Sequence, residues 1–180
     1  MSNKKIKYLI IGAGLSGLSA AYQLKKAGET NVTLLESRNR TGGRILTKDG
    51  IDYGATWLND GHSTLLNFLS HLEIKKYKQY NAGNSCFIYN LNTAPQIFET
   101  NPEEPPSYRI VGGTTSIIRR LAEELEDHIK LNEKVEKIRE EGHLLQVTTD
   151  QQVYFAEKVI ITIPPALATY LEYRLSLIHI

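Results

Sequence analysis

The sequence predicts an α/β protein with a parallel sheet that starts from a βαβ unit. Three observations predict it. Residues 6–11 form a continuous apolar run, typical of a strand buried on both faces. Residues 15–27 carry apolar side chains at helical spacing and are followed by Gly28 as a helix stop, and residues 32–35 form a second apolar run. Strand, helix and strand within about 30 residues imply a right-handed crossover between parallel strands.

Periodicity and turn residues predict the remaining elements in chain order. They are a helix at 62–72, short strands between 80 and 108, a proline-rich loop at 102–106, a helix after Gly112-Gly113 with cap hydroxyls at 114–116, and strands at 135–139, 144–149, 153–155 and 159–163.

The composition excludes several classes of protein. Among the 180 residues, 41% are hydrophobic, enough for a core, and 21 Lys and Arg against 20 Asp and Glu argue against a nucleic-acid partner. Cys86 is the single cysteine and the five histidines are scattered, so neither an internal disulfide nor a metal site is expected. The longest apolar stretch, residues 8–15, falls far short of the roughly 20 residues of a membrane span. We therefore expect a cytoplasmic protein without membrane association.

A G-x-G-x-x-G motif lies between the first strand and its helix. The candidate cofactor contacts in it are Gly12, Ala13, Gly14, Leu15, Ser16 and Gly17. Gly12 permits a tight turn, Gly14 lets the backbone approach a pyrophosphate, and Gly17 lets the helix pack close to the strand. The helix N-terminus presents N–H groups and a positive dipole end to phosphates. This context predicts a Rossmann-like dinucleotide-binding domain, although glycines that serve only a turn remain an alternative.

Glu36 follows the second strand, 19 residues after Gly17. Its carboxylate is placed to accept hydrogen bonds from both hydroxyls of a ribose, and it would repel a 2′-phosphate. NADP is therefore disfavoured, whereas FAD and NAD both fit the glycine motif.

The residues that follow resemble a known family. Leu-Glu-Ser-Arg at 35–38 and Thr-Gly-Gly-Arg at 41–44 are similar to the L-E-A-R-x-R-x-G-G-R signature of flavin-containing amine oxidases, with Ser37 in place of the usual alanine. Gly42 and Gly43 allow a loop to wrap a cofactor, and Arg44 offers a planar set of donors to the pyrophosphate. Arg38 is a further candidate contact. Solvated loop charges are the alternative for Arg38 and Arg40, and a better one for Arg40.

Further segments extend the resemblance over residues 6–173. Residues 52–57 are similar to the family's D-x-G-A-x-W segment, which lies against the isoalloxazine ring; the implied contacts are Gly54, Ala55, Thr56 and Trp57. For Trp57, filling the core is an equal alternative. Residues 109–113 resemble R-x-x-G-G, and residues 159–164 resemble V-I-x-T-x-P. Residues 131–138 resemble L-N-x-x-V-x-x-I, in which Val135 meets the adenine end through its backbone.

The resemblance implies an FAD-dependent amine oxidase. Such enzymes move a hydride equivalent from the carbon beside an amine nitrogen to flavin N5, and dioxygen then reoxidises the flavin to give hydrogen peroxide. Their catalytic groups come from a C-terminal half that this sequence does not match, so no catalytic residue is assigned and the chain alone is expected to be inactive. The alternatives are a protoporphyrinogen oxidase-like or carotenoid desaturase-like enzyme, an NAD-dependent dehydrogenase, and a non-catalytic dinucleotide-binding fragment.

The implied architecture is an FAD-binding domain interrupted by part of an α+β substrate domain and truncated at its C-terminus. Residues 1–57 and 112–174 are assigned to the FAD-binding domain, and residues 58–111 to the substrate domain. Residues 175–180 are expected to be a non-native tail, because they correspond to a translated transposon-type sequencing adapter; a natural frayed terminus is the alternative.

Overall fold

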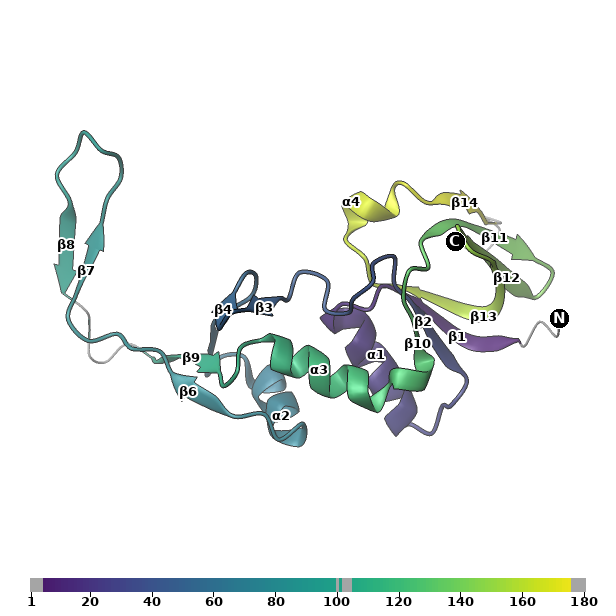
Figure 1. Cartoon of the computed structure of the whole chain (residues 1–180), viewed down its shortest axis with the longest axis horizontal. Helices are drawn as coiled ribbons and strands as arrows, with labels where there is room; N and C mark the ends of the chain where they lie inside the picture. Colours follow the sequence, from purple (N-terminus) through teal and green to yellow (C-terminus); the bar gives the residue numbers. More distant parts are fainter. Residues whose placement is uncertain (1–4, 100, 102–104, 176–180) are drawn as a thin grey trace.

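The computed structural model describes residues 5–99, 101 and 105–175. Its main feature is a seven-stranded mixed sheet in the order β10-β2-β1-β13-β12-β11-β14 (Figure 1). The strands of this sheet are β1 (Ile6–Ile11), β2 (Val32–Leu35), β10 (Ile129–Lys130), β11 (Val135–Glu141), β12 (Leu144–Thr149), β13 (Val153–Ile161) and β14 (Glu172–Arg174). The first four in spatial order run parallel, whereas β12 runs antiparallel to both of its neighbours.

The predicted βαβ unit is confirmed. β1 pairs in parallel with β2, with Ile10 opposite Leu34, and the connecting helix α1 spans Leu15–Lys26. Gly28 follows the helix with φ +87°, a backbone conformation that favours glycine. Because side chains alternate along a strand, Ile10 packs into the core on the side of α1 while its neighbours pack on the opposite face. Both faces of β1 are therefore buried, which accounts for its continuous apolar run.

The two strands predicted at 153–155 and 159–163 are one strand, β13. Its first half pairs antiparallel with β12 and its second half pairs parallel with β1, so that Ala156 has a partner on both sides. The charged residues Glu157 and Lys158 lie between the two predicted segments; both side chains are exposed, and Glu157 forms an ion pair with Lys5 at 2.7 Å. The strand continues because these charges can point to solvent without interrupting the ladder.

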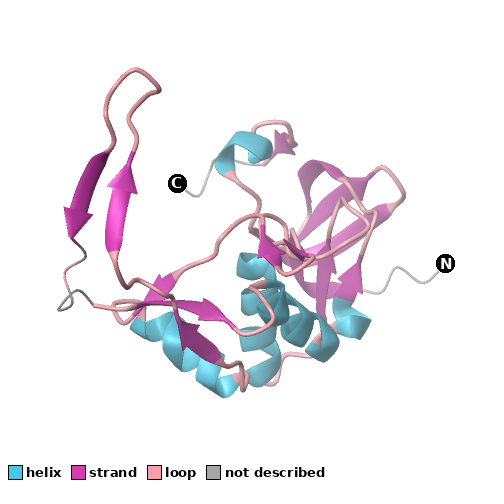
Figure 2. Cartoon of the chain, turned by 60° about the vertical axis from the view of Figure 1, so that its left-hand side comes forward, coloured by secondary structure: helices cyan, strands magenta, loops and turns pink. Residues whose placement is uncertain are grey.

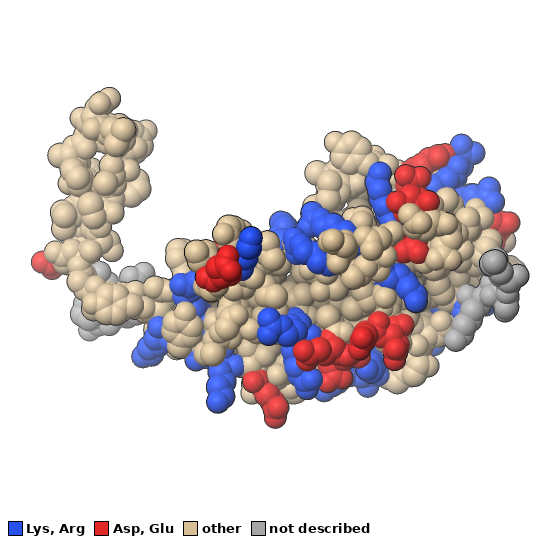
Figure 3. Space-filling view, viewed as in Figure 1, with Lys and Arg blue, Asp and Glu red and all other residues tan. Residues whose placement is uncertain are grey.

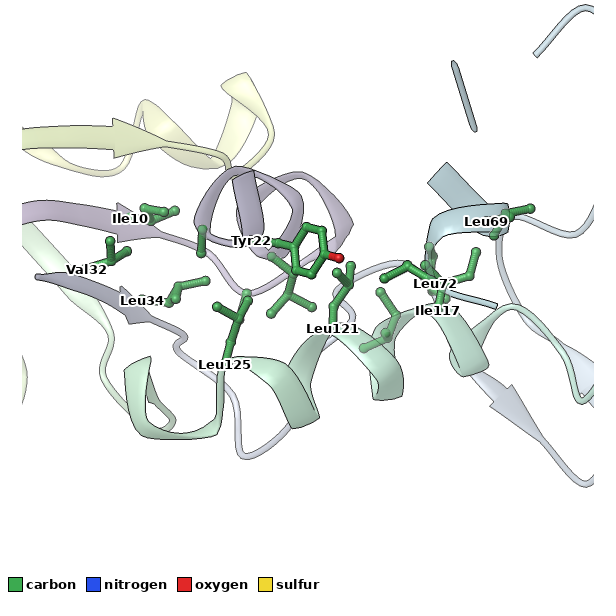
Figure 4. Packing of buried hydrophobic residues seen from close by; sticks show 14 of the residues in the cluster. Ile10, Tyr22, Val32, Leu34, Leu69, Leu72, Ile117, Leu121 and Leu125 are labelled. Carbon is green, nitrogen blue, oxygen red and sulfur yellow. The ribbon is translucent and has the colours of Figure 1, made fainter. Parts of the chain in front are cut away.

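Two helices lie against one face of the seven-stranded sheet, and a third packs against them away from the sheet (Figure 1). α3 (Thr115–Glu124) lies beside α1, and α2 (Ser63–His71) lies at the far end of the buried cluster that these helices share (Figures 1 and 4). Tyr22 of α1 and Phe68 of α2 are in edge-to-face contact. The predicted helices at 62–72 and after Gly113 are thus confirmed. A short 3-10 turn, Glu126–His128, leads from α3 into β10. The labelled core residues in Figure 4 are Ile10, Tyr22, Val32, Leu34, Leu69, Leu72, Ile117, Leu121 and Leu125.

The start of α3 corrects the predicted cap hydroxyls. The Thr114 hydroxyl donates to Oδ1 of Asp52 at 2.9 Å, and so does the Thr114 N–H, also at 2.9 Å. The carboxylate of Asp52 therefore caps the helix from a separate strand, a role that Ser, Thr, Asp or Asn ordinarily fills from the N-cap position. Thr115 exchanges hydrogen bonds with Thr47 instead. These contacts tie α3 to the short hairpin β3 (Thr47–Lys48) and β4 (Ile51–Asp52).

The middle segment shares the core of the rest. A three-stranded sheet in the order β5-β9-β6 joins β5 (Leu58–Asn59), β9 (Ser107–Ile110) and β6 (Lys76–Lys78). Leu58, Leu69 and Ile110 belong to the same buried cluster as α1 and α3. Because this buried cluster extends across both assigned boundaries, it does not mark them, and the domain boundaries at 57 and 111 remain a prediction. Part of the predicted proline-rich loop, 102–104, and most of the predicted tail, 176–180, lie outside the described residues.

A hairpin of β7 (Asn84–Phe87) and β8 (Gln96–Glu99) stands away from the body (Figures 1 and 2). Every residue of its two strands is exposed. Residues 81–98 contain no charged side chain, and Figure 3 shows a hairpin almost without charge beside a body covered by both signs. Within the described residues, no helix is long and apolar enough to cross a membrane.

Candidate dinucleotide site

The turn after β1 brings the first glycines of the motif to the carboxyl edge of the sheet. The Gly12 N–H donates to the Leu35 carbonyl at 2.8 Å, and the Thr162 hydroxyl donates to the Ile11 carbonyl at 2.8 Å. Gly12 has φ +103°, which explains its need for glycine. A Cβ on Gly17 would lie 1.9 Å from the Gly12 carbonyl oxygen, so only glycine lets α1 approach the strand this closely. These two steric predictions are confirmed.

The first turn of α1 is suited to bind an anion. Gly14 is the N-cap and has no side chain to occupy the helix end, and the first turn carries no acidic residue. Leu15 is half-buried and Ser16 is exposed. The positive end of the helix dipole and its N-terminal N–H groups are the elements that hold phosphates in proteins.

Glu36 is buried beside this turn, with 7% of its surface exposed. Its Oε2 accepts from the Ala13 N–H at 3.0 Å, and its Oε1 accepts from the Arg38 N–H at 3.1 Å and from the Ser37 hydroxyl at 3.4 Å. A carboxylate has about four acceptor positions, so capacity for further donors remains at Oε2. The carboxylate is thus fixed in place and still able to accept hydrogen bonds from a sugar.

A pocket of about 570 Å³ opens at this edge of the sheet. Four predicted site residues contribute to its wall: Gly12, Glu36, Ser37 and Val135. The remaining wall is mainly apolar, with three charged residues: it comprises Ile11, Leu35, Ile163, Leu167, Tyr170 and Leu171 together with Glu133, Lys134 and Glu136. The position agrees with the rule that ligands of open α/β sheets bind outside the carboxyl ends of the strands.

The loop before Val135 is held against the end of β2. The Asn132 N–H donates to the Arg38 carbonyl at 3.0 Å, and the Glu133 N–H donates to the Glu36 carbonyl at 2.9 Å. Asn132 has φ +58°, a conformation that asparagine tolerates better than most residues. These bonds fix the spacing between Glu36 and Val135, two residues that are 99 positions apart in sequence.

Glu133, a buried residue that also lines the pocket, is not among the predicted site residues. Its Oε2 accepts from the Thr149 hydroxyl at 2.6 Å, and its Oε1 accepts from Gln152 Nε2 at 2.7 Å and from the Tyr154 hydroxyl at 2.8 Å. Burial is the main cause that raises the pKa of Tyr154 well above its ordinary value, and the hydrogen bond to Glu133 and the negative charge of Glu133 raise it further. The phenol therefore keeps its proton and stays a hydrogen-bond donor. The donors lie 16 to 21 residues away from Glu133 in sequence, so no local sequence motif predicts this hydrogen-bonded cluster.

The second glycine loop touches the first. The Gly42 N–H donates to the Ala13 carbonyl at 2.8 Å, and a Cβ on Gly43 would lie 3.4 Å from Gly14 Cα. Gly42 and Gly43 have φ +98° and +58°, so the predicted unusual backbone is confirmed. The interpretation of Arg40 as a solvated charge is wrong, because its guanidinium donates to the Thr41 and Gly43 carbonyls at 3.0 and 2.9 Å.

Arg38 also reaches this loop, and Arg44 does not engage it with its side chain. Nη1 of Arg38 donates to the Gly43 carbonyl at 3.3 Å from an exposed position. The Arg44 side chain is exposed, and among the described residues its guanidinium has no hydrogen-bond or ion-pair partner. Its donors therefore remain available to a ligand.

The segment at 54–57 continues from the second loop. A Cβ on Gly54 would lie 1.9 Å from the Arg44 carbonyl oxygen, so contact with the protein's own loop already requires glycine there. Ala55 is exposed, Thr56 is half-buried with its hydroxyl bonded to the Gly54 carbonyl, and Trp57 is 70% exposed and hence not a core residue of this structure. The predicted residues thus form a continuous band, from the pocket through the two glycine loops to this segment.

Comparisons with known proteins identify the family. The model of the flavin containing amine oxidoreductase family matches residues 15–109 and 80–176. The chain is 42% identical over 86 residues to a probable flavin-containing monoamine oxidase A of Dictyostelium discoideum, covering 46% of this chain and 19% of that protein. Putrescine oxidase of Kocuria rosea is 37% identical over 84 residues, covering 44% of this chain and 17% of that protein. Protoporphyrinogen oxidase 2 of Arabidopsis thaliana is 32% identical over 108 residues, covering 58% and 21%.

Solved structures agree in fold. Putrescine oxidase bound to putrescine superposes with a TM-score of 0.82 at 20% identity, covering 94% of this chain and 60% of that chain. Cyclohexylamine oxidase from Brevibacterium oxydans gives the same TM-score at 15% identity, covering 93% and 60%. The chain spans about a fifth of the length of the curated relatives it matches. The α/β fold and the FAD cofactor expected from the sequence are confirmed at the level of the family. Because the family model matches most of the length of this chain, the chain belongs to the flavin containing amine oxidoreductases.

Proposed function

We propose that this chain is the FAD-binding part of an oxidase that converts an amine to an imine. The observation that carries the proposal is the buried Glu36 carboxylate, fixed beside the Gly12 turn in a pocket that also reaches Val135. Bound FAD supplies the electron acceptor for the oxidation, with dioxygen as the final acceptor and hydrogen peroxide as a product. The residues of the chain bind and orient this cofactor.

Each part of the band has its own role in the proposal. Glu36 accepts from the ribose hydroxyls, and the N-terminus of α1 faces the diphosphate. Arg44, whose guanidinium is exposed, adds donors to the diphosphate. Val135 contacts the adenine through its backbone, and residues 54–57 lie toward the isoalloxazine ring. A small-molecule amine is the proposed substrate, and a cytoplasmic location stays a prediction.

A second candidate is another FAD oxidoreductase of the same superfamily. The similarity to protoporphyrinogen oxidase 2, over a longer stretch than either amine oxidase match, favours keeping it. The cofactor-binding residues alone do not distinguish an amine oxidase from such an enzyme, because both classes need the same kind of dinucleotide-binding site. A non-catalytic dinucleotide-binding fragment is the third candidate, and turnover by the full-length protein against none by this chain would support it.

Titration of the purified chain with FAD, followed by flavin fluorescence, tests the cofactor site. Glu36→Gln and Arg44→Ala should each weaken FAD binding roughly ten-fold, since charge-assisted hydrogen bonds contribute about 1.5–3 kcal/mol. Glu123→Gln and Arg120→Ala, on the exposed face of α3, are the matched controls and should bind like the unaltered chain. Unchanged affinity in both site variants would show that the cofactor is placed wrongly.

Catalysis is tested separately by a peroxide assay. The 180 residues include no assigned catalytic group, so we expect no peroxide from this chain with FAD and a panel of primary amines and diamines. Peroxide formation above that of free FAD would contradict this expectation, whatever the result of the binding titration.

A further inference from the structure

The pocket has one wall that the glycine motif and Glu36 do not explain. It comes from the segment after β13, which contains the short helix α4 (Pro165–Ala168) and leads into β14. Leu167 and Tyr170 line the pocket from this segment, yet 49% and 83% of their surfaces are exposed. Large apolar side chains at the rim of a ligand pocket, rather than in the core, are typical of groups that the ligand itself covers.

The segment is anchored on both sides of these two residues. At the start of the segment, the Leu167 N–H donates to the Pro164 carbonyl at 2.8 Å, and Pro164 and Pro165 restrict the backbone. After them, Leu171 is buried in the cluster beneath the sheet, and Lys137 of β11 forms an ion pair with Glu172 at 3.1 Å. β14 also pairs in parallel with β11, the strand that begins at Val135. The exposed wall is therefore held in a fixed position relative to the adenine end of the proposed site.

We propose that Tyr170 and Leu167 bind the adenine ring of the cofactor, with the phenol ring stacked on the base. This inference rests on the proposed FAD site, because Glu36 and Val135 in the same pocket set where the ribose and base lie. Adenine is flat and has an apolar face, so an aromatic and an aliphatic side chain suit it, and stacking tolerates the absence of hydrogen bonds from the wall. The dinucleotide would bury both side chains.

Calorimetric titration with ADP and with FAD, using the whole 180-residue chain, tests the contact. Tyr170→Ala should weaken binding of both ligands roughly ten-fold, within the range measured for loss of a base-stacking aromatic residue. Tyr170→Phe should bind like the unaltered chain, because the ring and not the hydroxyl makes the contact. Leu167→Ala gives a second variant of the same wall and should weaken both ligands less. Tyr89→Ala removes an equally exposed tyrosine from the distant hairpin and should have no effect.

The outcomes separate this inference from the proposed function. If the unaltered chain binds ADP and FAD, and Tyr170→Ala binds them equally well, the adenine contact is wrong while the cofactor site stands. Equal losses in Tyr170→Phe and Tyr170→Ala would also overturn stacking, since they would assign the effect to the hydroxyl. If the unaltered chain binds neither ligand, the proposed function itself fails. Circular dichroism and thermal unfolding of each ligand-free variant exclude loss of folding as the cause.

Discussion

At the scale of single residues, three buried carboxylates organise the loops around the site. Glu36 is held by two backbone N–H groups, Glu133 by hydroxyl and amide side chains, and Asp52 by donors from the start of α3. Within the part of the chain that the structure describes, Asp52 alone of the three has an ion-pair partner, Arg109 Nη2 at 3.6 Å. Since a buried charge is costly unless its oxygens accept hydrogen bonds, each carboxylate fixes the segments that supply its donors.

Asp52 allows a prediction about pH. Burial acts to raise the pKa of Asp52, but hydrogen bonds from Thr47 and Thr114 and the charge of Arg109 outweigh it and lower the pKa below its ordinary value. A lowered folded-state pKa stabilises the protein above the unfolded-state value, near pH 4, and this stability is lost as pH falls through the folded-state value. Asp52→Asn should therefore lower the free energy of unfolding by about 1–2 kcal/mol at pH 7 and by less at pH 3.

Urea unfolding at both pH values measures this difference. Asp127→Asn, at an exposed position after α3, is the control and should change the stability by less than about 0.5 kcal/mol at either pH. A penalty for Asp52→Asn that is as large at pH 3 as at pH 7 would show that the charge of Asp52 is not what holds α3.

At the scale of elements, the close approach of α1 to β1 depends on one glycine. The Cβ of Gly17→Ala would meet the Gly12 carbonyl, a backbone atom that cannot rotate away. We expect the helix to shift and the protein to lose about 1–3 kcal/mol of stability, as for other overpacked substitutions, with FAD affinity reduced as well. Thermal unfolding and flavin titration measure the two effects. Ser19→Ala in the same helix controls for helix propensity, and a Gly17→Ala variant as stable as this control would refute the steric argument.

The elements that the sequence predicts well are those whose cause is local. The apolar run of β1, the stripe of α3 and the glycine motif each depend on neighbours a few residues away, so their patterns are visible in the chain. The cap of α3 comes from Asp52, 62 residues earlier, and the carbonyls bound by Arg40 are available only once the loop has folded. Likewise, the place of Glu36 in the site can be predicted from a sequence motif, whereas the places of Glu133 and Tyr170 can be seen only in the tertiary structure. Most of these features therefore depend on contacts between segments that are distant in the chain, whereas the Arg40 bonds are local and depend on the conformation of its own loop.

At the scale of the whole molecule, the sheet separates two clusters of buried residues. One lies under α1, α2 and α3 and extends to Leu58 and Ile110, and the other lies between the sheet and Leu171. The hairpin β7–β8 belongs to neither cluster, as its position apart from the body shows (Figure 1). The folding stability of the described chain should therefore come from the body, and the hairpin should contribute surface properties instead.

The β7–β8 hairpin is expected to promote association between molecules of this protein. Its free strand edges, apolar side chains and lack of charge between residues 81 and 98 are features that promote edge-to-edge association of β-strands. Ile97→Lys places a charge on β8 at a side chain that is 63% exposed, so it should leave the thermal midpoint unchanged and reduce self-association at high concentration. Ile51→Lys on β4, at 58% exposure, is the control and should leave association unaltered. Sedimentation velocity over a concentration series measures the association. Equal association of the unaltered chain and of Ile97→Lys would mean that the hairpin edge does not join the molecules. A lowered thermal midpoint of Ile97→Lys would mean that the hairpin contributes to the stability of the body.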